Sequence, residues 1–289
     1  MGDYKKVIGG GAPLKQCAEK LMHSGFAHDL QDIELIEYSL SKQPQTQLRK
    51  FADEHKLGYS AFNKSVHVND ALRNEKLKSL IFSISNTCIF PEDVVGKGNL
   101  DIVNKHSSLL PRHPGSGGMC WTIFHEDEQG GLTWHFVDEG IDSGDIIAQA
   151  AVNIPTGYDV NRLTRDCDPL IAPSFADILE PLLNQTAPRK KQILLPDRRV
   201  NGWKECPNSG ILTPDDDIEY THRILRGFLL DQNAPQWMLD LAPKLYIDHE
   251  GKLRQVVGYD MREAGMEARP EQIRITQDDK ELVLDTLNK

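Results

Sequence analysis

The chain has 289 residues and is 39% hydrophobic, which is enough to bury the core of a large domain with a small one attached. Its formal net charge of -10 repels polyanions, so we expect no nucleic acid partner. No apolar run approaches the roughly 18 residues of a transmembrane helix, and residues 1–11 lack the apolar core of a signal peptide. We therefore expect a cytoplasmic protein that does not enter a membrane.

The cysteines are odd in number and widely spaced, and none forms a CxxC pair. They are Cys17, Cys88, Cys120, Cys167 and Cys206. This pattern indicates neither a disulfide framework nor a structural zinc site. We expect ordinary reduced thiols.

The N-terminal segment reads as a strand, a glycine turn and a helix. Val7 and Ile8 precede three glycines at 9–11, and a helical pattern continues to about Ser24. This order is typical of an open α/β sheet. The turn does not complete a GxGxxG fingerprint, so it does not predict NAD and disfavours a dinucleotide-dependent oxidoreductase.

Strand and helix patterns then alternate along the chain. We predict strands over 33–38, 58–62, 78–85, 100–104 and 132–137, a helix over 45–55, and an apolar run over 145–154. This alternation predicts an α/β fold: an open, Rossmann-like, mostly parallel sheet with helices on both faces.

The composition changes after the sheet. A helix over 159–183 is expected, interrupted by Pro169 and Pro173, and it leads into Pro-, Lys- and Arg-rich sequence. We place a domain boundary near Ala187. Residues 1–187 then form the large domain, and residues 188–289 form a linker and a small α+β domain. A helix over 218–230 and strands over 244–247, 253–259 and 272–276 are predicted in the latter.

Polar residues follow the predicted strand at 100–104. Asn104 and His106 lie two apart, so their side chains leave the same face of the strand. Ligands of open α/β sheets bind outside the carboxyl ends of the strands, which is where this pair is expected. Taken alone, the pair is more often a turn-capping asparagine and a satisfied histidine.

An acidic cluster follows the strand at 132–137. It contains Asp138, Glu139, Asp142 and Asp145, spaced by Gly140 and Gly144. Acidic residues in glycine loops are commonly turn formers. The spacing does not match that of a calcium-binding EF-hand, so we predict no metal site.

The two clusters together resemble the 10-formyltetrahydrofolate-dependent formyltransferases. That family carries N-x-H, then P-S-L-L-P, a glycine, an aromatic-containing helix, a strand and D-x-G-x-D-x-G. The corresponding residues here are Asn104-Lys105-His106, Ser107 to Pro111, Gly115, Trp121, 132–137 and Asp138 to Gly144. Ser107 departs from the pattern, since the family often has proline or another small residue there. Over residues 1–80 only the architecture is similar, and over 196–289 the resemblance is weaker still, although 218–227 looks like the helix that opens the family's C-terminal domain.

The resemblance implies a role for each of three residues, within a catalytic domain over 1–187. Asn104 and His106 would stabilise the oxygen that gains negative charge when an amine attacks the formyl carbon. Asp142 would orient His106 and receive the amine proton, directly or through water. No covalent enzyme intermediate is needed, so Ser108 and Cys120 are not expected to act as nucleophiles.

The resemblance also implies a folate site, with 10-formyltetrahydrofolate as the formyl donor. The residues expected to line it are Ser85, Ile89, Phe90, Ser108, Leu109, Leu110, Pro111 and Asp138. The apolar members would form a slot for the pterin ring. Ile89 and Phe90 could equally belong to the core.

The acceptor is expected to be the primary amine of a small molecule. A nucleotide-linked amino sugar is the preferred acceptor, because the Lys- and Arg-rich segment 189–199 could bind a diphosphate. An amino acid such as hydroxyornithine is the alternative. Methionyl-tRNA is disfavoured by the acidic charge and a purine precursor by the length of the chain. A folate-binding regulatory module without activity is a further alternative, against which the intact Asn104, His106 and Asp142 count. Homo-oligomerisation stays open.

Overall fold

The computed structural model describes residues 4–24, 32–39, 46–85, 87–194, 199–232, 234, 236–263 and 272–287. The chain forms two compact units. Unit 1 comprises residues 1–114, 131–152 and 166–199, and unit 2 comprises residues 115–130, 153–165 and 200–289. The boundary expected near Ala187 stays a prediction.

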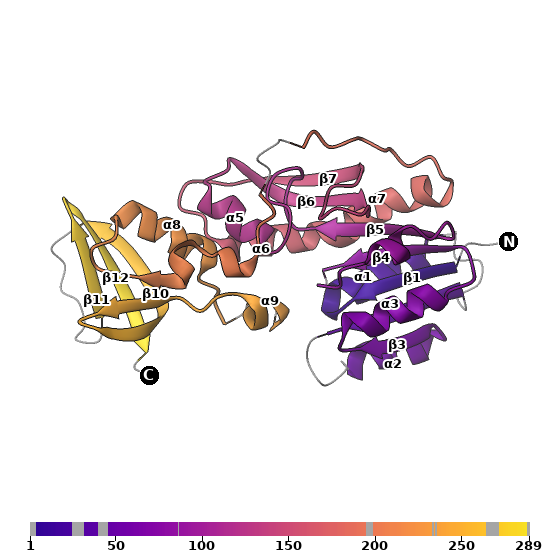
Figure 1. The fold of residues 1–289 in the computed structure, drawn as a ribbon, viewed down its shortest axis with the longest axis horizontal. Helices are drawn as coiled ribbons and strands as arrows, with labels where there is room; N and C mark the ends of the chain where they lie inside the picture. The colour runs from indigo at the N-terminus through magenta and orange to yellow at the C-terminus, as the bar shows by residue number, and fades with distance from the viewer. Residues whose placement is uncertain are drawn as a thin grey trace. The chain divides into compact units, whose positions relative to one another are not determined.

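Unit 1 is built on a sheet that has seven strands within the described residues, in the order β3-β2-β1-β4-β5-β6-β7. The first five strands in this order run parallel to one another, and β6 is antiparallel to β5. The predicted mostly parallel α/β sheet is confirmed (Figure 1). Its strands are β1 (Tyr4–Gly9), β2 (Ile33–Tyr38), β3 (Gly58–Phe62), β4 (Ser79–Ile84), β5 (Leu100–His106), β6 (Gln129–Phe136) and β7 (Ile146–Asn153).

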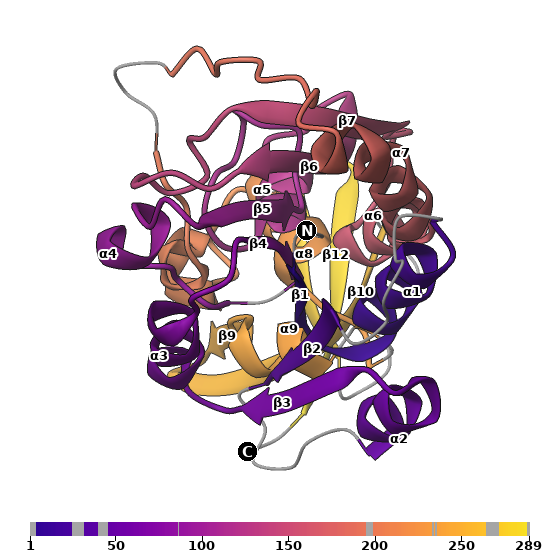
Figure 2. The ribbon, with the colours of Figure 1, turned by 90° about the vertical axis from the view of Figure 1, so that its right-hand side faces the viewer.

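Helices cover both faces of this sheet (Figure 2). Alternate residues of each strand face opposite sides, so Val7 lies in the core beneath α1, α2 and α7, whereas Ile8 lies in the core beneath α3 and α4. The bounds of these helices are α1 (Gly11–Met22), α2 (Thr46–His55), α3 (Ser65–Asn74), α4 (Glu92–Val95) and α7 (Ile171–Leu183). Helices α3 and α4 were not among the predicted elements.

The glycine turn after β1 has a packing role. A Cβ at Gly9 would lie 2.3 Å from the carbonyl oxygen of Ile84 on the neighbouring strand β4. Only glycine fits this close approach of two backbones. Helix α1 begins two residues later, at Gly11.

The helical segment after β7 breaks once. Helix α6 (Val160–Cys167) is followed by a short 3-10 turn, Asp168–Leu170, and then by α7. Pro169 lies in that turn, as predicted. The second predicted interruption is wrong, because Pro173 sits in the first turn of α7, where the missing amide hydrogen has no intrahelical partner to lose.

Unit 2 contains a sheet with five strands among its described residues, in the order β11-β12-β10-β9-β8. Its strands are β8 (Ile211–Leu212), β9 (Tyr246–His249), β10 (Lys252–Glu263), β11 (Gln272–Gln277) and β12 (Lys280–Leu287). Its helices are α5 (Gly118–Phe124), α8 (Ile218–Phe228), α9 (Gln236–Leu241) and residues 160–165 of α6. The predicted small α+β region is present, although β8, β12 and α9 were not among the predicted elements.

Each cysteine is a buried free thiol. Burial raises the pKa of Cys17, Cys88, Cys167 and Cys206 to about 12. Such thiols are largely protonated near neutral pH and therefore weakly nucleophilic. Among the described helices, none combines the length and apolar character needed to cross a membrane.

Candidate active site

A row of polar side chains crosses three neighbouring strands of unit 1. The strand register places Ser83 of β4 beside Asn104 of β5, and Asn104 beside His135 of β6. The Ser83 hydroxyl donates to Oδ1 of Asn104 at 2.9 Å, and Nδ2 of Asn104 lies 3.2 Å from Nε2 of His135. The amide of Asn104 is thereby fixed with its nitrogen towards β6.

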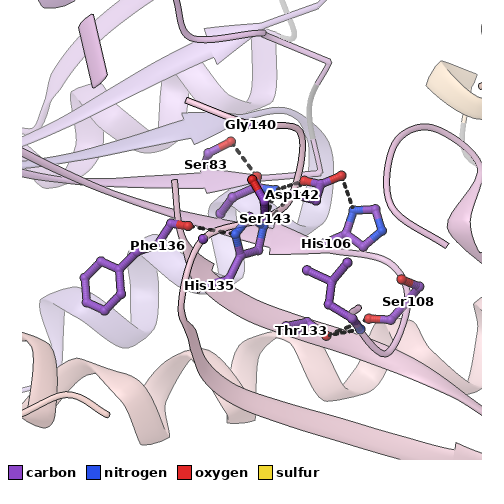
Figure 3. Close-up of polar contacts among 12 residues, drawn as sticks. Ser83, His106, Ser108, Thr133, His135, Phe136, Gly140, Asp142 and Ser143 are labelled. Carbon is purple, nitrogen blue, oxygen red and sulfur yellow. Dashed lines mark hydrogen bonds and ion pairs between the residues drawn. The ribbon is translucent and has the colours of Figure 1, made fainter. Parts of the chain in front are cut away.

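Asp142 reaches this row from the loop over 137–145, which follows β6. Its Oδ2 lies 3.3 Å from Nδ1 of His106 (Figure 3). Its Oδ1 lies 3.4 Å from Nε2 of His135 and 3.5 Å from Nδ2 of Asn104. The Asp142 side chain is 14% exposed, so the carboxylate sits among these three groups with little contact with solvent. The structure therefore brings together Asn104, His106 and Asp142.

His106 and His135 each have one ring nitrogen within hydrogen-bond distance of a backbone carbonyl oxygen. Nε2 of His106 lies 2.9 Å from the His113 carbonyl oxygen, and Nδ1 of His135 lies 2.8 Å from that of Phe136. A carbonyl only accepts, so each of these nitrogens carries a hydrogen. In a neutral His135, Nε2 is then an acceptor, and it receives a hydrogen from Asn104.

Burial sets the proton affinity of His106. The buried position lowers the pKa of His106, while the Asp142 carboxylate and the His113 carbonyl oppose this effect. The neighbouring His135 and Lys105 lower it further. The His106 ring is therefore mostly neutral near pH 7 and can take up a proton.

The segment from Ser108 to Pro111 is held to β6 by Thr133, which lies beside His106 in the strand register. The Thr133 hydroxyl donates to the Ser108 carbonyl at 2.7 Å and accepts from the Leu110 amide at 3.1 Å. Gln149 of β7 donates to the Leu110 carbonyl at 2.9 Å. Neither Thr133 nor Gln149 was among the predicted site residues.

The predicted folate residues of this segment differ in exposure. The Ser108 hydroxyl is buried and donates to the Arg112 carbonyl at 2.7 Å, and Leu110 is also buried. Leu109 is half-buried, and Pro111 is exposed. Their expected contact with folate stays a prediction.

The remaining predicted folate residues lie on two other loops. After β4, Ser85 and Phe90 are half-buried and the Ile89 side chain is 63% exposed. Asp138 accepts the Ser143 hydroxyl at 2.7 Å and the Gly140 amide at 3.2 Å, so it shapes the loop that carries Asp142. Their role towards a ligand also stays a prediction.

Lys105 lies between the two site residues of β5 and faces the opposite side of the sheet. Its amino group is buried and donates to the Ser107 hydroxyl at 2.8 Å. Burial lowers the pKa of Lys105, and the Asp168 carboxylate opposes this effect. Ser107, the departure from the family pattern, is thus the partner of a buried amine.

A formyl transferase family model matches residues 38–169, which include Asn104, His106 and Asp142. Methionyl-tRNA formyltransferase of Clostridioides difficile is 30% identical over 122 residues, or 41% of this chain and 40% of that protein. Cytosolic 10-formyltetrahydrofolate dehydrogenase of mouse is 31% identical over 103 residues, or 35% of this chain and 11% of that one. The chain thus matches less than half the length of each of these relatives.

Two solved structures resemble the whole chain. A sugar 3N-formyltransferase, solved with dTDP and 5-N-formyl-THF, has a TM-score of 0.72 at 17% identity and covers 100% of this chain and 99% of its own. An N-formyltransferase of Helicobacter canadensis, solved with folinic acid and dTDP-3-aminofucose, has a TM-score of 0.73 at 16% identity, with coverages of 99% and 100%. At these identities the likeness establishes a shared fold. The family match and the shared fold agree with the motifs in the sequence, and residues 38–169 are similar in sequence to the formyl transferase family.

Proposed function

We propose that this chain transfers the formyl group of 10-formyltetrahydrofolate to the primary amine of a small molecule. The observation that carries the proposal is the convergence of Asn104, His106 and Asp142 within residues 38–169, with the carboxylate 3.3 Å from one imidazole and 3.5 Å from the amide. An amide donor, a histidine and a carboxylate can supply the oxyanion stabilisation and the proton transfer that acyl transfer to an amine needs.

In the proposed reaction, the amine nitrogen bonds to the formyl carbon and the bond from that carbon to N10 of the folate breaks. Asn104, and His106 once it has taken up the proton of the amine, stabilise the negative charge that develops on the formyl oxygen. Asp142 and the mostly neutral His106 take up the proton that the amine loses, and this proton is returned to N10 of the departing tetrahydrofolate. No side chain becomes covalently modified.

The residues present suit a flat, partly apolar donor. Ile89 is 63% exposed on the loop after β4, and Ile141, next to Asp142, is 38% exposed. Large apolar side chains at such exposure offer surface to a ring system, while the backbone groups beside them can pair with its polar edge. We propose that Leu109 and Pro111 belong to the same folate-binding surface.

We propose a nucleotide-linked amino sugar as the acceptor. Support comes from the whole-chain fold likeness to sugar N-formyltransferases and from the formal charge of -10, which disfavours tRNA. Exposed Lys190 and Lys191 in the segment after α7 could meet a diphosphate. The sequence likeness to methionyl-tRNA formyltransferases favours the alternative acceptor, but it extends over only 41% of this chain in the C. difficile comparison.

The test is to incubate the protein with 10-formyltetrahydrofolate and each of a panel of acceptors: nucleotide-linked amino sugars, hydroxyornithine and charged methionyl-tRNA. Transfer is detected by mass spectrometry, as release of tetrahydrofolate and as the gain of a formyl group by the acceptor. We expect turnover with an amino sugar. Turnover with the tRNA alone would overturn the proposed acceptor. Folate binding without turnover on any acceptor would favour the regulatory module.

A further inference from the structure

The segment that follows α7 lies along the edge of the sheet in unit 1. The backbones of Lys190 and Ile146 exchange two hydrogen bonds, of 2.8 and 3.0 Å, as an antiparallel bridge to β7. One residue earlier, the Arg189 guanidinium lies 3.6 Å from the centroid of the Phe136 ring. Residues 189–192, which we call the strap, are therefore attached both to β7 and to the end of β6.

The strap ends at a side chain that contacts the catalytic loop. Nε2 of Gln192 donates to the carbonyl oxygen of Asp142 at 3.0 Å and to that of Gly144 at 2.7 Å. A primary amide nitrogen has two hydrogens, so both are used on this one loop. The Oε1 atom of Gln192 is buried and has no partner among the described residues. The position of the Gln192 side chain is therefore explained by the two hydrogen bonds that Nε2 donates, and not by a hydrogen bond to Oε1.

The loop contains one unusual backbone conformation and one very close contact with β6. Asp142 has a φ of +48°, in the left-handed region that side chains other than glycine seldom adopt. A Cβ at Gly144 would lie 1.9 Å from the Phe136 carbonyl oxygen, so the loop passes very close to the end of β6. The side chain of Asp142 is held by the sheet residues, whereas Gln192 holds its backbone.

We propose that Gln192 is a positioning residue that sets the place of the Asp142 carboxylate through the loop backbone. The positioning role follows from the geometry, and only its effect on catalysis rests on the proposed function. Gln192 lies 50 residues beyond Asp142 in the sequence and outside the two polar clusters from which the site was predicted. The proposal therefore adds a distant segment to the site. Loss of the two donated hydrogen bonds would let the loop shift, and the carboxylate would lose its alignment with His106.

The first experiment compares Gln192→Met, which keeps the length but removes both donors, with Gln129→Met as a matched control. Gln129 is exposed at the start of β6, and its side-chain amide contacts Asn153. With 10-formyltetrahydrofolate and the best acceptor of the panel, kcat of Gln192→Met should fall about tenfold to a hundredfold, because small misplacements of reacting groups are costly. The KM for the folate should change less than kcat, and Gln129→Met should match the wild type.

The second measurement needs no turnover. NMR titration of ring-labelled histidines gives the pKa of His106, whose signal is identified by its loss in His106→Asn. The Asp142 carboxylate raises this pKa, against the lowering by burial, His135 and Lys105. In Gln192→Met the carboxylate is less well aligned, so the pKa of His106 should fall below its wild-type value. An unchanged pKa together with an unchanged kcat would overturn the proposal.

If Gln192→Met fails to fold, Gln192→Glu keeps the proposal testable, because it preserves shape. Its carboxylate faces two carbonyl oxygens at neutral pH, but regains one donor when protonated. The ratio of its kcat to that of the wild type should therefore rise as the pH falls, and a flat ratio would count against the proposal. Should the wild type transfer formyl to no acceptor while the pKa of His106 still responds to Gln192→Met, the proposed function fails and the positioning role stands.

Discussion

Nε2 of His135 lies 3.4 Å from Oδ1 of Asp142, and the same nitrogen lies 3.2 Å from the amide nitrogen of Asn104. His135 is 2% exposed and donates from its other nitrogen to the Phe136 carbonyl. A second histidine thus joins the predicted trio, and its ring orientation is set by the backbone of its own strand. Its contacts hold the Asn104 amide nitrogen towards Asp142.

We expect His135→Gln to be milder than His135→Asn. Glutamine can place a polar atom near the position of Nε2, whereas asparagine reaches only the position of Nδ1 and removes the acceptor at Nε2 from the Asn104 amide nitrogen. His135→Asn should lower kcat for formyl transfer about tenfold to a hundredfold, with circular dichroism unchanged. Steady-state kinetics on both variants measure this. Equal losses in the two variants would argue against the positioning of Asn104 by Nε2.

Asp142→Asn should abolish formyl transfer and leave the fold intact. The amide is isosteric and asparagine tolerates the left-handed φ of +48°, but it cannot accept the proton that the amine loses. We expect a fall in kcat of at least about a hundredfold, and a similar fall for His106→Ala. Thermal unfolding serves as the control for both variants. Near-wild-type activity in either variant would contradict the proposed roles.

Acid should destabilise the wild type more steeply than His106→Asn. Burial holds the pKa of His106 in the folded state below the ordinary value of 6.5, which applies in the unfolded chain. Between these two pKa values the unfolded chain binds more protons, so the free energy of unfolding falls as the pH is lowered through this window. Urea unfolding at several pH values between about 7.5 and about 5, a range that brackets the ordinary pKa of histidine, measures how the free energy of unfolding of each protein depends on pH.

A second buried histidine does not disturb this comparison. His222 of unit 2 also has a lowered pKa caused by burial, but it is present in both proteins and its slope cancels in the difference. If the two stability curves run parallel over the window, the lowered pKa of His106 is not coupled to folding.

Gly144→Ala should damage the catalytic loop. The new Cβ would meet the Phe136 carbonyl oxygen at 1.9 Å, so the loop that carries Asp142 must move. We expect a loss of about 1 to 3 kcal/mol in the free energy of unfolding and a fall in kcat. Gly98→Ala is the matched control, since a Cβ there meets nothing within 4 Å. Urea unfolding and kinetics on both variants check the contrast, and equal behaviour would be inconsistent with a closely packed loop.

Part of the fold was open to prediction because its signals are local. The buried strands of the sheet are short apolar runs, and strand β2 coincides with the predicted range 33–38. Helix α3 gave a weak signal, since its described buried residues are only Val68, Asn69 and Leu72, one of them polar. Strand β12 buries four consecutive residues, Glu281 to Leu284, so the alternation expected of a strand was absent.

The sequence by itself determined that Asn104 and His106 share a face of β5, because side chains alternate along any strand whatever lies beside it. Only the tertiary structure decided which groups meet them. Ser83 and His135 come from strands 21 and 31 residues away from Asn104 and are aligned by backbone hydrogen bonding between strands. Gln192 reaches Asp142 across 50 residues. Local periodicity carries no information on register or on the path of a distant segment, and these contacts depend on both.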